Sequence, residues 1–245
     1  MAHAQGFVLL QENRFDSAAF LRTLQQEWDI SPEEDGELDG DMLTFNVGEN
    51  LCAVSLMPAP IPDGEAEDNA AFNYYWPEAV EITRQHQAHL LVAVMPGGED
   101  SAVARMQLYS KIICSCLADA NALGVYTSGT VFAPDFYRSV CAEMRQGQLP
   151  VPIWVFLGLY QDEGGNNAYT IGMRQFDKME MEIRASQHDL NDIHGTLLGI
   201  CAYIISQDVT LHDGETIGFS AEQQLRISRS PAIAGGAEET LKIAY

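Results

Sequence analysis

The chain has 245 residues, of which 47% are hydrophobic and 20% charged, a composition typical of a folded globular protein. Its charge is unusual, because 35 acidic residues against 13 Lys and Arg give a formal net charge of −22. That charge repels nucleic-acid phosphates and anionic membrane surfaces. It therefore argues against nucleic acids and membranes as partners.

Three further features predict where the protein is located and in which redox state its cysteines are. No apolar run approaches the roughly 18 residues of a membrane-spanning helix. The first residues, Met-Ala-His-Ala-Gln-Gly, lack the basic and apolar regions of a secretory signal. Five cysteines without regular spacing are typical of reduced, buried thiols. We expect a cytoplasmic protein without disulfides.

The first part of the chain predicts strand, helix, hairpin, helix and strand. Asp16 can cap a helix in which Phe20, Leu24 and Trp28 recur at helical spacing. The apolar run that follows His89 is typical of a strand buried on both faces. The predicted segments are a strand at 7–10, a helix at 17–28, hairpin strands at 42–47 and 51–57, a helix at 70–87 and a strand at 89–95.

The second part repeats a similar order after a long helix that Gly124 would stop. The runs 90–94 and 153–157 are both short, apolar and bounded by helix breakers, so we expect them to be central strands. The predicted segments are helix 101–123, strand 125–132, helix 134–144, strand 153–160, its hairpin partner 169–173, helix 190–206 and short strands at 216–219, 225–227 and 241–245.

These elements predict the α+β class, with mixed or antiparallel sheets and helices. We expect a single compact domain over 1–245. Within it, residues 1–98 would form one ferredoxin-like βαββαβ unit and residues 99–123 a connecting helix. Residues 124–245 would form a second such unit with additional C-terminal strands.

A segment without basic residues is the most unusual feature of the sequence. Between Arg22 and Arg84 there is no Lys, Arg or His, but there are 15 acidic residues. Many of them fall on two predicted loops, one with Glu33, Glu34, Asp35, Glu37, Asp39 and Asp41, the other with Asp63, Glu65, Glu67 and Asp68.

The simpler interpretation of these loops is a solvated acidic surface that keeps the protein soluble. The sharper one is a docking face, because a patch of one sign speeds the capture of a basic partner. The alternation from Asp35 to Asp41 also resembles a calcium loop, but it lacks the glycine and the final glutamate of an EF-hand.

Histidines and cysteines give weaker indications. His86 and His89 are spaced so that both could approach one metal ion, but no third ligand is evident, so a structural role is favoured. Cys114 and Cys116 lie two apart in a predicted helix and do not face each other, which favours core thiols. We expect neither a metal nor a cofactor.

Residues 178–183 alternate strictly between polar and apolar side chains. An extended backbone places Lys178, Glu180 and Glu182 on one face, which the simpler interpretation makes an exposed face of a half-buried strand. If that face lined a pocket, two carboxylates and a lysine could serve as acid, base and positioning group. No hydrolase, nucleotide-binding or zinc-protease motif is present, so we assign no catalytic residue.

The order of several short motifs resembles domain-of-unknown-function family 4261 over nearly the whole chain. Asp177 departs from the pattern, which has glycine before the lysine, and this puts any site built on a tight turn there in doubt. The motifs are Met57-Pro58-x-Pro60-Ile61-Pro62, Trp76 with His86-x-x-His89-Leu90, Gly124-Val125-Tyr126, Pro150-x-Pro152-Ile153-Trp154, Thr170-x-Gly172-Met173-x-x-Phe176-x-Lys178-x-Glu180-x-Glu182-Ile183 and Asp213-Gly214-x-Thr216-Ile217-Gly218.

The resemblance implies a cytosolic bacterial protein often associated with type VI secretion gene clusters, and a similarity to an immunity protein. Such a protein binds and silences a toxin of its own cell. The expected partner is a cognate toxin with a basic surface, which we expect to be a nuclease, because an acidic inhibitor can complement the positive charge of such a surface. An enzyme using Lys178, Glu180 and Glu182, and an accessory scaffold of a secretion assembly, remain the alternatives.

Overall fold

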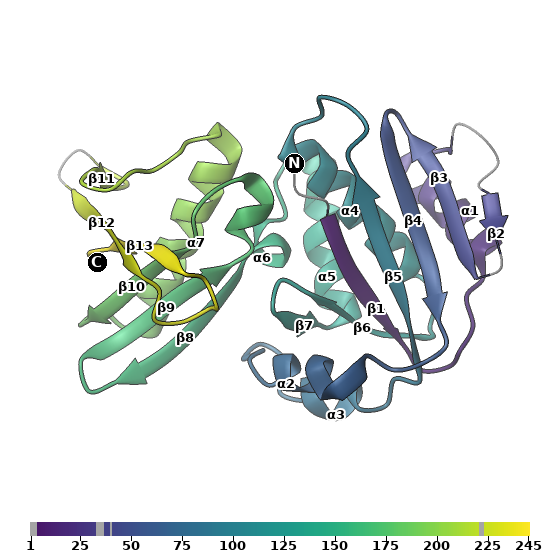
Figure 1. Ribbon diagram of the computed structural model, residues 1–245, viewed down its shortest axis with the longest axis horizontal. Helices are drawn as coiled ribbons and strands as arrows, with labels where there is room; N and C mark the ends of the chain where they lie inside the picture. The colour runs from purple at the N-terminus through teal and green to yellow at the C-terminus, as the bar shows by residue number, and fades with distance from the viewer. Residues whose placement is uncertain (1–3, 33–36, 40, 221–222) are drawn as a thin grey trace. The chain divides into compact units, whose positions relative to one another are not determined.

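The computed structural model describes residues 4–32, 37–39, 41–220 and 223–245 (Figure 1). The chain divides into two compact units, Met1–Ile153 and Trp154–Tyr245. Each unit combines one sheet with helices, so the predicted α+β class is confirmed. No helix in the described part of the chain has both the length and the apolar character needed to cross a membrane.

The first unit is built on a seven-stranded sheet with the strand order β2-β3-β4-β5-β1-β6-β7, in which every described strand pair is antiparallel. Its elements are β1 (Ala4–Leu10), α1 (Ser17–Trp28), β2 (Glu37–Asp39), β3 (Met42–Val47), β4 (Asn50–Met57), η1 (Pro62–Gly64), α2 (Glu65–Ala70), α3 (Ala79–Thr83), β5 (Ala88–Met95), α4 (Ala102–Cys116), β6 (Ala122–Thr127), β7 (Thr130–Phe132), α5 (Pro134–Ala142) and η2 (Glu143–Gln146). A short helix, α6 (Val151–Trp154), ends at the boundary with the second unit.

Several local predictions are confirmed in this unit. Asp16 caps α1, since its carboxylate accepts a hydrogen bond of 2.8 Å from the Ala19 N–H. β3 and β4 form the predicted hairpin, with Gly48 in the left-handed region at φ 56°. β5 is central, because it pairs with β4 on one side and β1 on the other.

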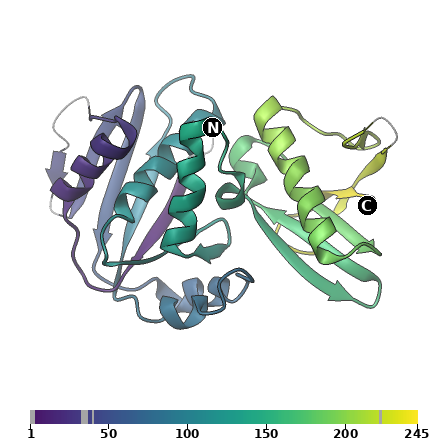
Figure 2. The same cartoon turned by 180° about the vertical axis from the view of Figure 1, so that it is seen from behind.

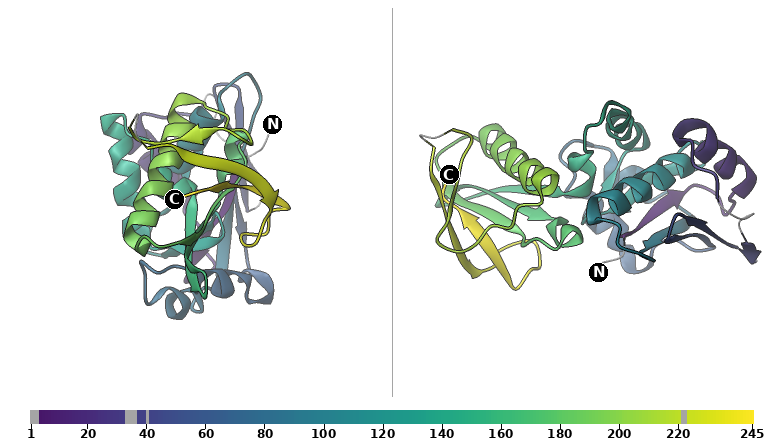
Figure 3. Two further views of the ribbon diagram at one scale, coloured as in Figure 1. Left: turned by 90° about the vertical axis from the view of Figure 1, so that its left-hand side faces the viewer. Right: turned by 90° about the horizontal axis from the view of Figure 1, so that it is seen from above.

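Helices cover the first sheet in two groups. Figure 3 shows α1 and α4 along one face, where α4 contacts β1 and β5. The short helices α2 and α3 pack near β6 and β7. There, Ala66 and Ala70 of α2 join Leu9, Tyr126 and Val131 in a buried cluster with Ile61 and Ala79. Small residues on α2 let the helix approach the sheet closely. This packing fixes the outward side of α2, which carries acidic residues.

The second unit has a six-stranded mixed sheet with the order β11-β12-β13-β10-β9-β8, covered by one long helix, α7 (Figure 2). β10 and β13 are parallel, whereas the other described pairs are antiparallel. Its elements are β8 (Phe156–Asp162), β9 (Gly165–Ile171), η3 (Met173–Phe176), β10 (Met181–Ser186), α7 (Leu190–Gln207), β11 (Thr216–Ile217), β12 (Leu225–Pro231) and β13 (Glu239–Ile243).

The chain divides at a different place from the predicted βαββαβ units, 1–98 and 124–245. β6 pairs with β1 and β7 pairs with β6, so residues 122–132 belong to the first sheet. The sequence supplies each strand but not its partner, because strand pairing over such a separation leaves no periodic pattern. The boundary between the two compact units in the chain therefore falls after residue 153 and not in the helix predicted at 99–123.

Several predicted elements have different bounds or form. The helix predicted over 101–123 ends at Cys116, with Leu117 as its C-cap, and β6 begins before Gly124. Within the helix predicted over 70–87, only α3 is helical apart from Ala70, the last residue of α2, and Pro77 lies in the connection between them. Ile153 and Trp154 lie in α6, and β8 starts at Phe156 and lies at the edge of its sheet. The run 153–157 is thus not a central strand.

Candidate functional site

The acidic residues singled out in the sequence divide among three kinds of position. Glu33, Glu34 and Asp35 lie outside the described residues. Glu37 and Asp39 belong to β2, and Glu65, Glu67 and Asp68 belong to α2, so neither group lies on a simple loop as predicted. Asp41 lies directly before β3 and Asp63 in η1.

The α2 acids combine exposure with a fixed backbone. Glu65, Asp68 and the preceding Asp63 are exposed, whereas Ala66 and Ala70 anchor the opposite side of the helix in the core. The Glu65 carboxylate also accepts a hydrogen bond of 2.6 Å from the Tyr126 hydroxyl. Because the backbone is held by buried contacts, these carboxylates are presented at defined positions.

Glu67 has a different environment from its neighbours. Its side chain is 20% exposed, and its Oε1 lies 3.8 Å from Nδ1 of the buried His86. By contrast, no ion pair joins Asp41, Asp63, Glu65 or Asp68 to a basic side chain in the described part of the chain. We call Asp63, Glu65, Glu67 and Asp68, which lie in η1 and α2, the acidic surface. Its charge is left largely uncompensated by the protein itself.

His86 and His89 have the structural roles that the sequence favours. The His86 Nδ1–H donates to the Thr83 carbonyl at 2.5 Å, and its Nε2 accepts from the Ile61 N–H at 2.8 Å. His89 donates from Nδ1 to the Ala59 carbonyl at 2.8 Å, and burial lowers its pKa below the ordinary value. Through these hydrogen bonds, the two rings connect residues 59–61 to the end of α3 and to β5.

Glu180 of the second unit forms a buried network with the turn between β9 and β10. Its Oε2 accepts from the Thr170 hydroxyl at 2.6 Å, and its Oε1 accepts from the Gly172 and Arg174 N–H groups at 3.0 and 3.3 Å. The residue is only 6% exposed, and burial raises the pKa of its carboxyl despite these bonds. Glu180 thus fastens η3 to the start of β10.

Glu182 is fully buried and pairs across to β13. Its partner in the strand register is Lys242, whose Nζ lies 3.2 Å from Glu182 Oε2. Glu182 Oε1 accepts from the Ile233 N–H at 2.9 Å. Lys242 also donates to the Pro231 carbonyl at 3.0 Å and to the Thr240 hydroxyl. The carboxylate therefore joins β10, β13 and the connection that precedes β13.

Lys178 has partners separate from those of the two glutamates. Its Nζ bonds the Asp208 carboxylate at 2.8 Å and the Thr210 hydroxyl at 3.0 Å, beyond the end of α7. The preceding residue, Asp177, adopts the left-handed conformation at φ 56°, the one that glycine favours. A tight turn is therefore present at this position, with aspartate in place of the expected glycine.

The predicted exposed face of residues 178–183 is wrong. Glu180 and Glu182 are buried, as are Met181 and Ile183 on the other side. The alternation predicts that only one face of the strand is buried. Both faces are buried in the structure, because α7 packs on the sheet and the backbone N–H groups of residues 233 and 234 donate hydrogen bonds to Glu182. Sequence reasoning missed Lys242, because the parallel pairing that brings it to Glu182 joins strands about sixty residues apart.

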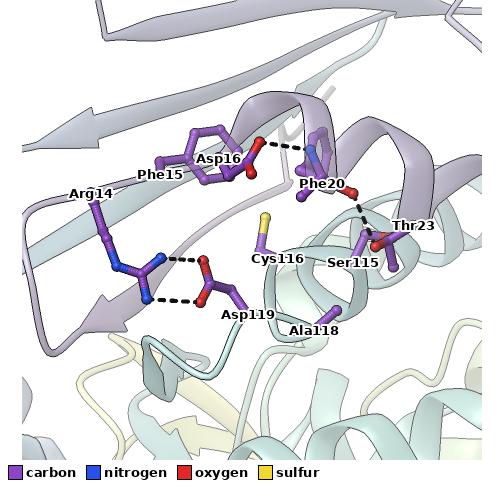
Figure 4. Close-up of a pocket in the computed structure, with 10 residues that line it drawn as sticks. Arg14, Phe15, Asp16, Phe20, Thr23, Ser115, Cys116, Ala118 and Asp119 are labelled. Atoms are coloured by element: carbon purple, nitrogen blue, oxygen red, sulfur yellow. Dashed lines mark hydrogen bonds and ion pairs between the residues drawn. The ribbon is translucent and has the colours of Figure 1, made fainter.

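A small cavity of about 150 Å³ lies in the first unit beside α1 and the end of α4 (Figure 4). The guanidinium of Arg14 forms a fork with Asp119 at 3.0 and 3.3 Å, and Asp16 is already used as the α1 cap. Cys116 also lines the cavity, and burial raises the pKa of its thiol, which disfavours a nucleophilic thiolate. The polar groups of this cavity therefore have structural roles.

Metal-binding and disulfide chemistry find no support among the side chains that can be placed. Within the described ranges, no group of three His, Cys, Asp or Glu side chains could hold a metal ion. Cys52, Cys114, Cys116, Cys141 and Cys201 are all buried free thiols.

The second unit is an α+β domain in which one helix covers a mixed sheet and buried carboxylates tie its turns together. Residues 169–244 match the family model of DUF4261, a domain of unknown function, which confirms the resemblance over this region. The motifs upstream of residue 169 lie outside the match. Searches for similar curated proteins and solved structures found no match.

Within the matched region, the motif residues have a physical role. Thr170, Gly172 and Glu180 belong to the network around η3, and Gly172 has φ 127°. A side chain at Gly172 would collide with the Trp154 carbonyl. The polar pattern from Thr170 to Glu182 therefore maintains the fold of the second unit.

Proposed function

We propose that this protein is a binding protein that captures a basic protein partner through its acidic surface, and that the partner is a toxin of a type VI secretion system. One observation carries the proposal. The segment between Arg22 and Arg84 has 15 acidic residues and no basic one, and its acids at 41, 63, 65 and 68 lack basic partners among the described residues. The toxin class comes from the family resemblance.

Charge complementarity explains why a nuclease toxin fits best. A nuclease needs positive charge to hold its substrate, so an acidic protein can occupy the same surface. Long-range attraction raises the association rate, and this effect weakens as salt screens the charges. An immunity protein benefits from rapid association, because the toxin must be silenced before it acts.

The buried network makes the enzyme alternative less favourable. An acid–base site needs side chains that can reach a substrate. Glu180 and Glu182 are instead buried with hydrogen-bond donors around them, and Lys178 bonds Asp208. The scaffold alternative makes no use of a concentrated acidic surface.

Co-expression tests the proposal directly. Each secreted-effector reading frame in the type VI gene cluster of the source genome is induced with and without this protein. We expect protection against one effector, and a stable complex of the two purified proteins. If none of these effectors is neutralised or bound, the proposal is wrong.

A pair of triple variants tests the role of the acidic surface in that complex. The first carries Asp63→Asn, Glu65→Gln and Asp68→Asn; the control carries Glu163→Gln, Asp192→Asn and Glu238→Gln, which are exposed acids of the second unit. We expect the first variant to associate about tenfold more slowly at low salt, and the control to associate at nearly the wild-type rate. Equal rates for the two variants would contradict the acidic surface.

A further inference from the structure

An exposed aromatic segment lies next to the acidic surface. The connection between α2 and α3, residues 71–78, carries Phe72, Tyr74 and Tyr75 with 55%, 42% and 58% of their surface exposed. We call residues 71–78 the aromatic connection. Large apolar side chains gathered on a surface are characteristic of protein-binding sites, where aromatic residues are enriched.

Buried anchors hold the aromatic connection in place. The Asn73 side chain is buried and donates to the Val131 carbonyl at 2.7 Å, and its Oδ1 accepts from the Tyr75 N–H at 2.9 Å. Trp76 packs against the core cluster that includes Leu9 and Val131. Because the backbone is fixed between these anchors, the exposed rings lose little conformational freedom when a partner binds.

Ring contacts extend from this connection onto α5. The Tyr74 and Tyr75 rings lie 4.4 Å apart, and Tyr75 stacks on Phe136 at 6.2 Å with an interplanar angle of 17°. Phe136 in turn stacks on the buried Phe132 at 6.0 Å. The exposed tyrosine is thus supported from beneath by a row of rings that ends in the core.

The charges along the chain on either side of the aromatic connection are negative. Glu65, Glu67 and Asp68 precede it in α2, Glu78 is its last residue, and Glu81 follows it in α3. Among nearby basic residues, Arg84 is exposed beyond α3, and Arg138 of α5 already pairs with Glu27 at 2.9 Å. Aromatic faces attract cations as well, and the field of the uncompensated carboxylates nearby attracts the same cations.

We propose that the aromatic connection and α2 form one docking surface, on which an Arg- and Lys-rich protein surface binds with cations over the tyrosine rings. This inference rests on the proposed function and specifies its interface. Contacts with the rings slow the dissociation of the complex, whereas the acids of α2 accelerate its association.

Two single variants and a matched control test the surface. Phe72→Ala and Tyr75→Ala remove exposed rings, and Tyr203→Ala removes an exposed ring from α7 in the second unit, where Tyr203 is 48% exposed. The probe is the effector that the wild-type protein neutralises, purified in a catalytically inactive form. Association and dissociation rates are measured at two salt concentrations, and thermal unfolding of each variant confirms that it is folded.

We expect Tyr75→Ala to weaken binding at least tenfold, mainly through faster dissociation. Phe72→Ala should act in the same direction, Tyr75→Phe should retain most of the affinity, and Tyr203→Ala should bind as the wild type does. If the folded Phe72→Ala and Tyr75→Ala variants bind as tightly as the wild type, the docking surface is wrong while the proposed function stands. If no effector binds the wild type, both are wrong.

Discussion

Two groups of carboxylates, one in each unit, have opposite environments. In the first unit, Asp63, Glu65 and Asp68 are exposed and have no basic partner among the described residues. In the second unit, Glu180 and Glu182 are buried and bonded to backbone N–H groups, and Glu182 also pairs with Lys242. Acidic composition alone therefore does not identify a binding site, because Glu180 and Glu182 maintain the fold, whereas the carboxylates of Asp63, Glu65 and Asp68 are exposed.

The largest expected effect concerns the buried ion pair of the second unit. Glu182→Ala leaves Lys242 without its carboxylate at a site where Lys242 is only 15% exposed. Removing one partner of a buried pair costs about 3–5 kcal/mol of unfolding free energy. Urea unfolding measures the loss of unfolding free energy. The transition is monitored by the fluorescence of Trp154 in a protein that also carries Trp28→Phe and Trp76→Phe. In the double variant Glu182→Ala, Lys242→Met the loss should be smaller; an equal or larger loss would contradict the pairing.

The next effect concerns the network around η3. Glu180→Ala leaves the Gly172 N–H and the Thr170 hydroxyl without their acceptor. An unsatisfied buried polar group costs about 1–3 kcal/mol, so we expect a loss of that size in the same fluorescence assay. A loss below about 0.5 kcal/mol, the size of a typical surface substitution, would show that Glu180 is not structural.

A pH dependence of stability should follow from the same residue. Burial raises the folded-state pKa of Glu180, so the folded chain binds this proton more tightly than the unfolded chain does. The contribution of Glu180 is therefore fully present below its unfolded pKa and is lost as pH rises through the folded pKa. Relative to Glu180→Gln, the wild type should be more stable at pH 4 than at pH 7. A difference independent of pH would contradict the raised pKa.

A smaller effect concerns the turn before Lys178. Asp177 adopts the left-handed conformation, which costs a non-glycine residue about 1 kcal/mol. Asp177→Gly relieves this cost but adds backbone entropy to the unfolded chain, so we expect a gain between about 0 and 1 kcal/mol. Gly172→Ala is the contrasting variant and should be destabilising, because its side chain would meet the Trp154 carbonyl. A clear loss in Asp177→Gly would show that the aspartate side chain is needed.

The smallest effect for each residue replaced is expected on the acidic surface. Neutralising Asp63, Glu65 and Asp68 together should change the unfolding free energy by less than about 0.5 kcal/mol for each residue, because exposed charges contribute little. The change in unfolding free energy is measured by urea unfolding of the wild type and the triple variant at low and high salt. A large loss would mean that these acids maintain the fold, and the comparison between the two units would then fail.

Some elements could be predicted because their causes are local. Asp16 identifies the start of α1, since a cap acts on the next turn. The apolar run after Ala88 identifies β5, since a strand buried on both faces has few polar residues. The hairpin of β3 and β4 follows from two strand segments around a short turn.

Other features required long-range pairing and therefore escaped prediction. The polar alternation from Lys178 to Glu182 predicts an exposed face, yet Lys242 and the backbone at 233–234 bury it from a distant part of the chain. Residues 122–132 look like the start of a second unit, yet β6 completes the first sheet by pairing with β1. Sequence periodicity reports how one segment is buried, not which segment buries it.

The sequence by itself therefore determined the α+β class, the concentration of acids between Arg22 and Arg84, and the DUF4261 resemblance that the match over 169–244 confirms. Tertiary structure decided which carboxylates are available to a partner. Burial in a folded chain depends on contacts between segments far apart in sequence, and the free energy of a carboxylate depends mainly on its burial and on the donors around it. For that reason Glu182, with Lys242 beside it, belongs to the core, and Glu65, on a helix anchored by Ala66 and Ala70, belongs to the surface.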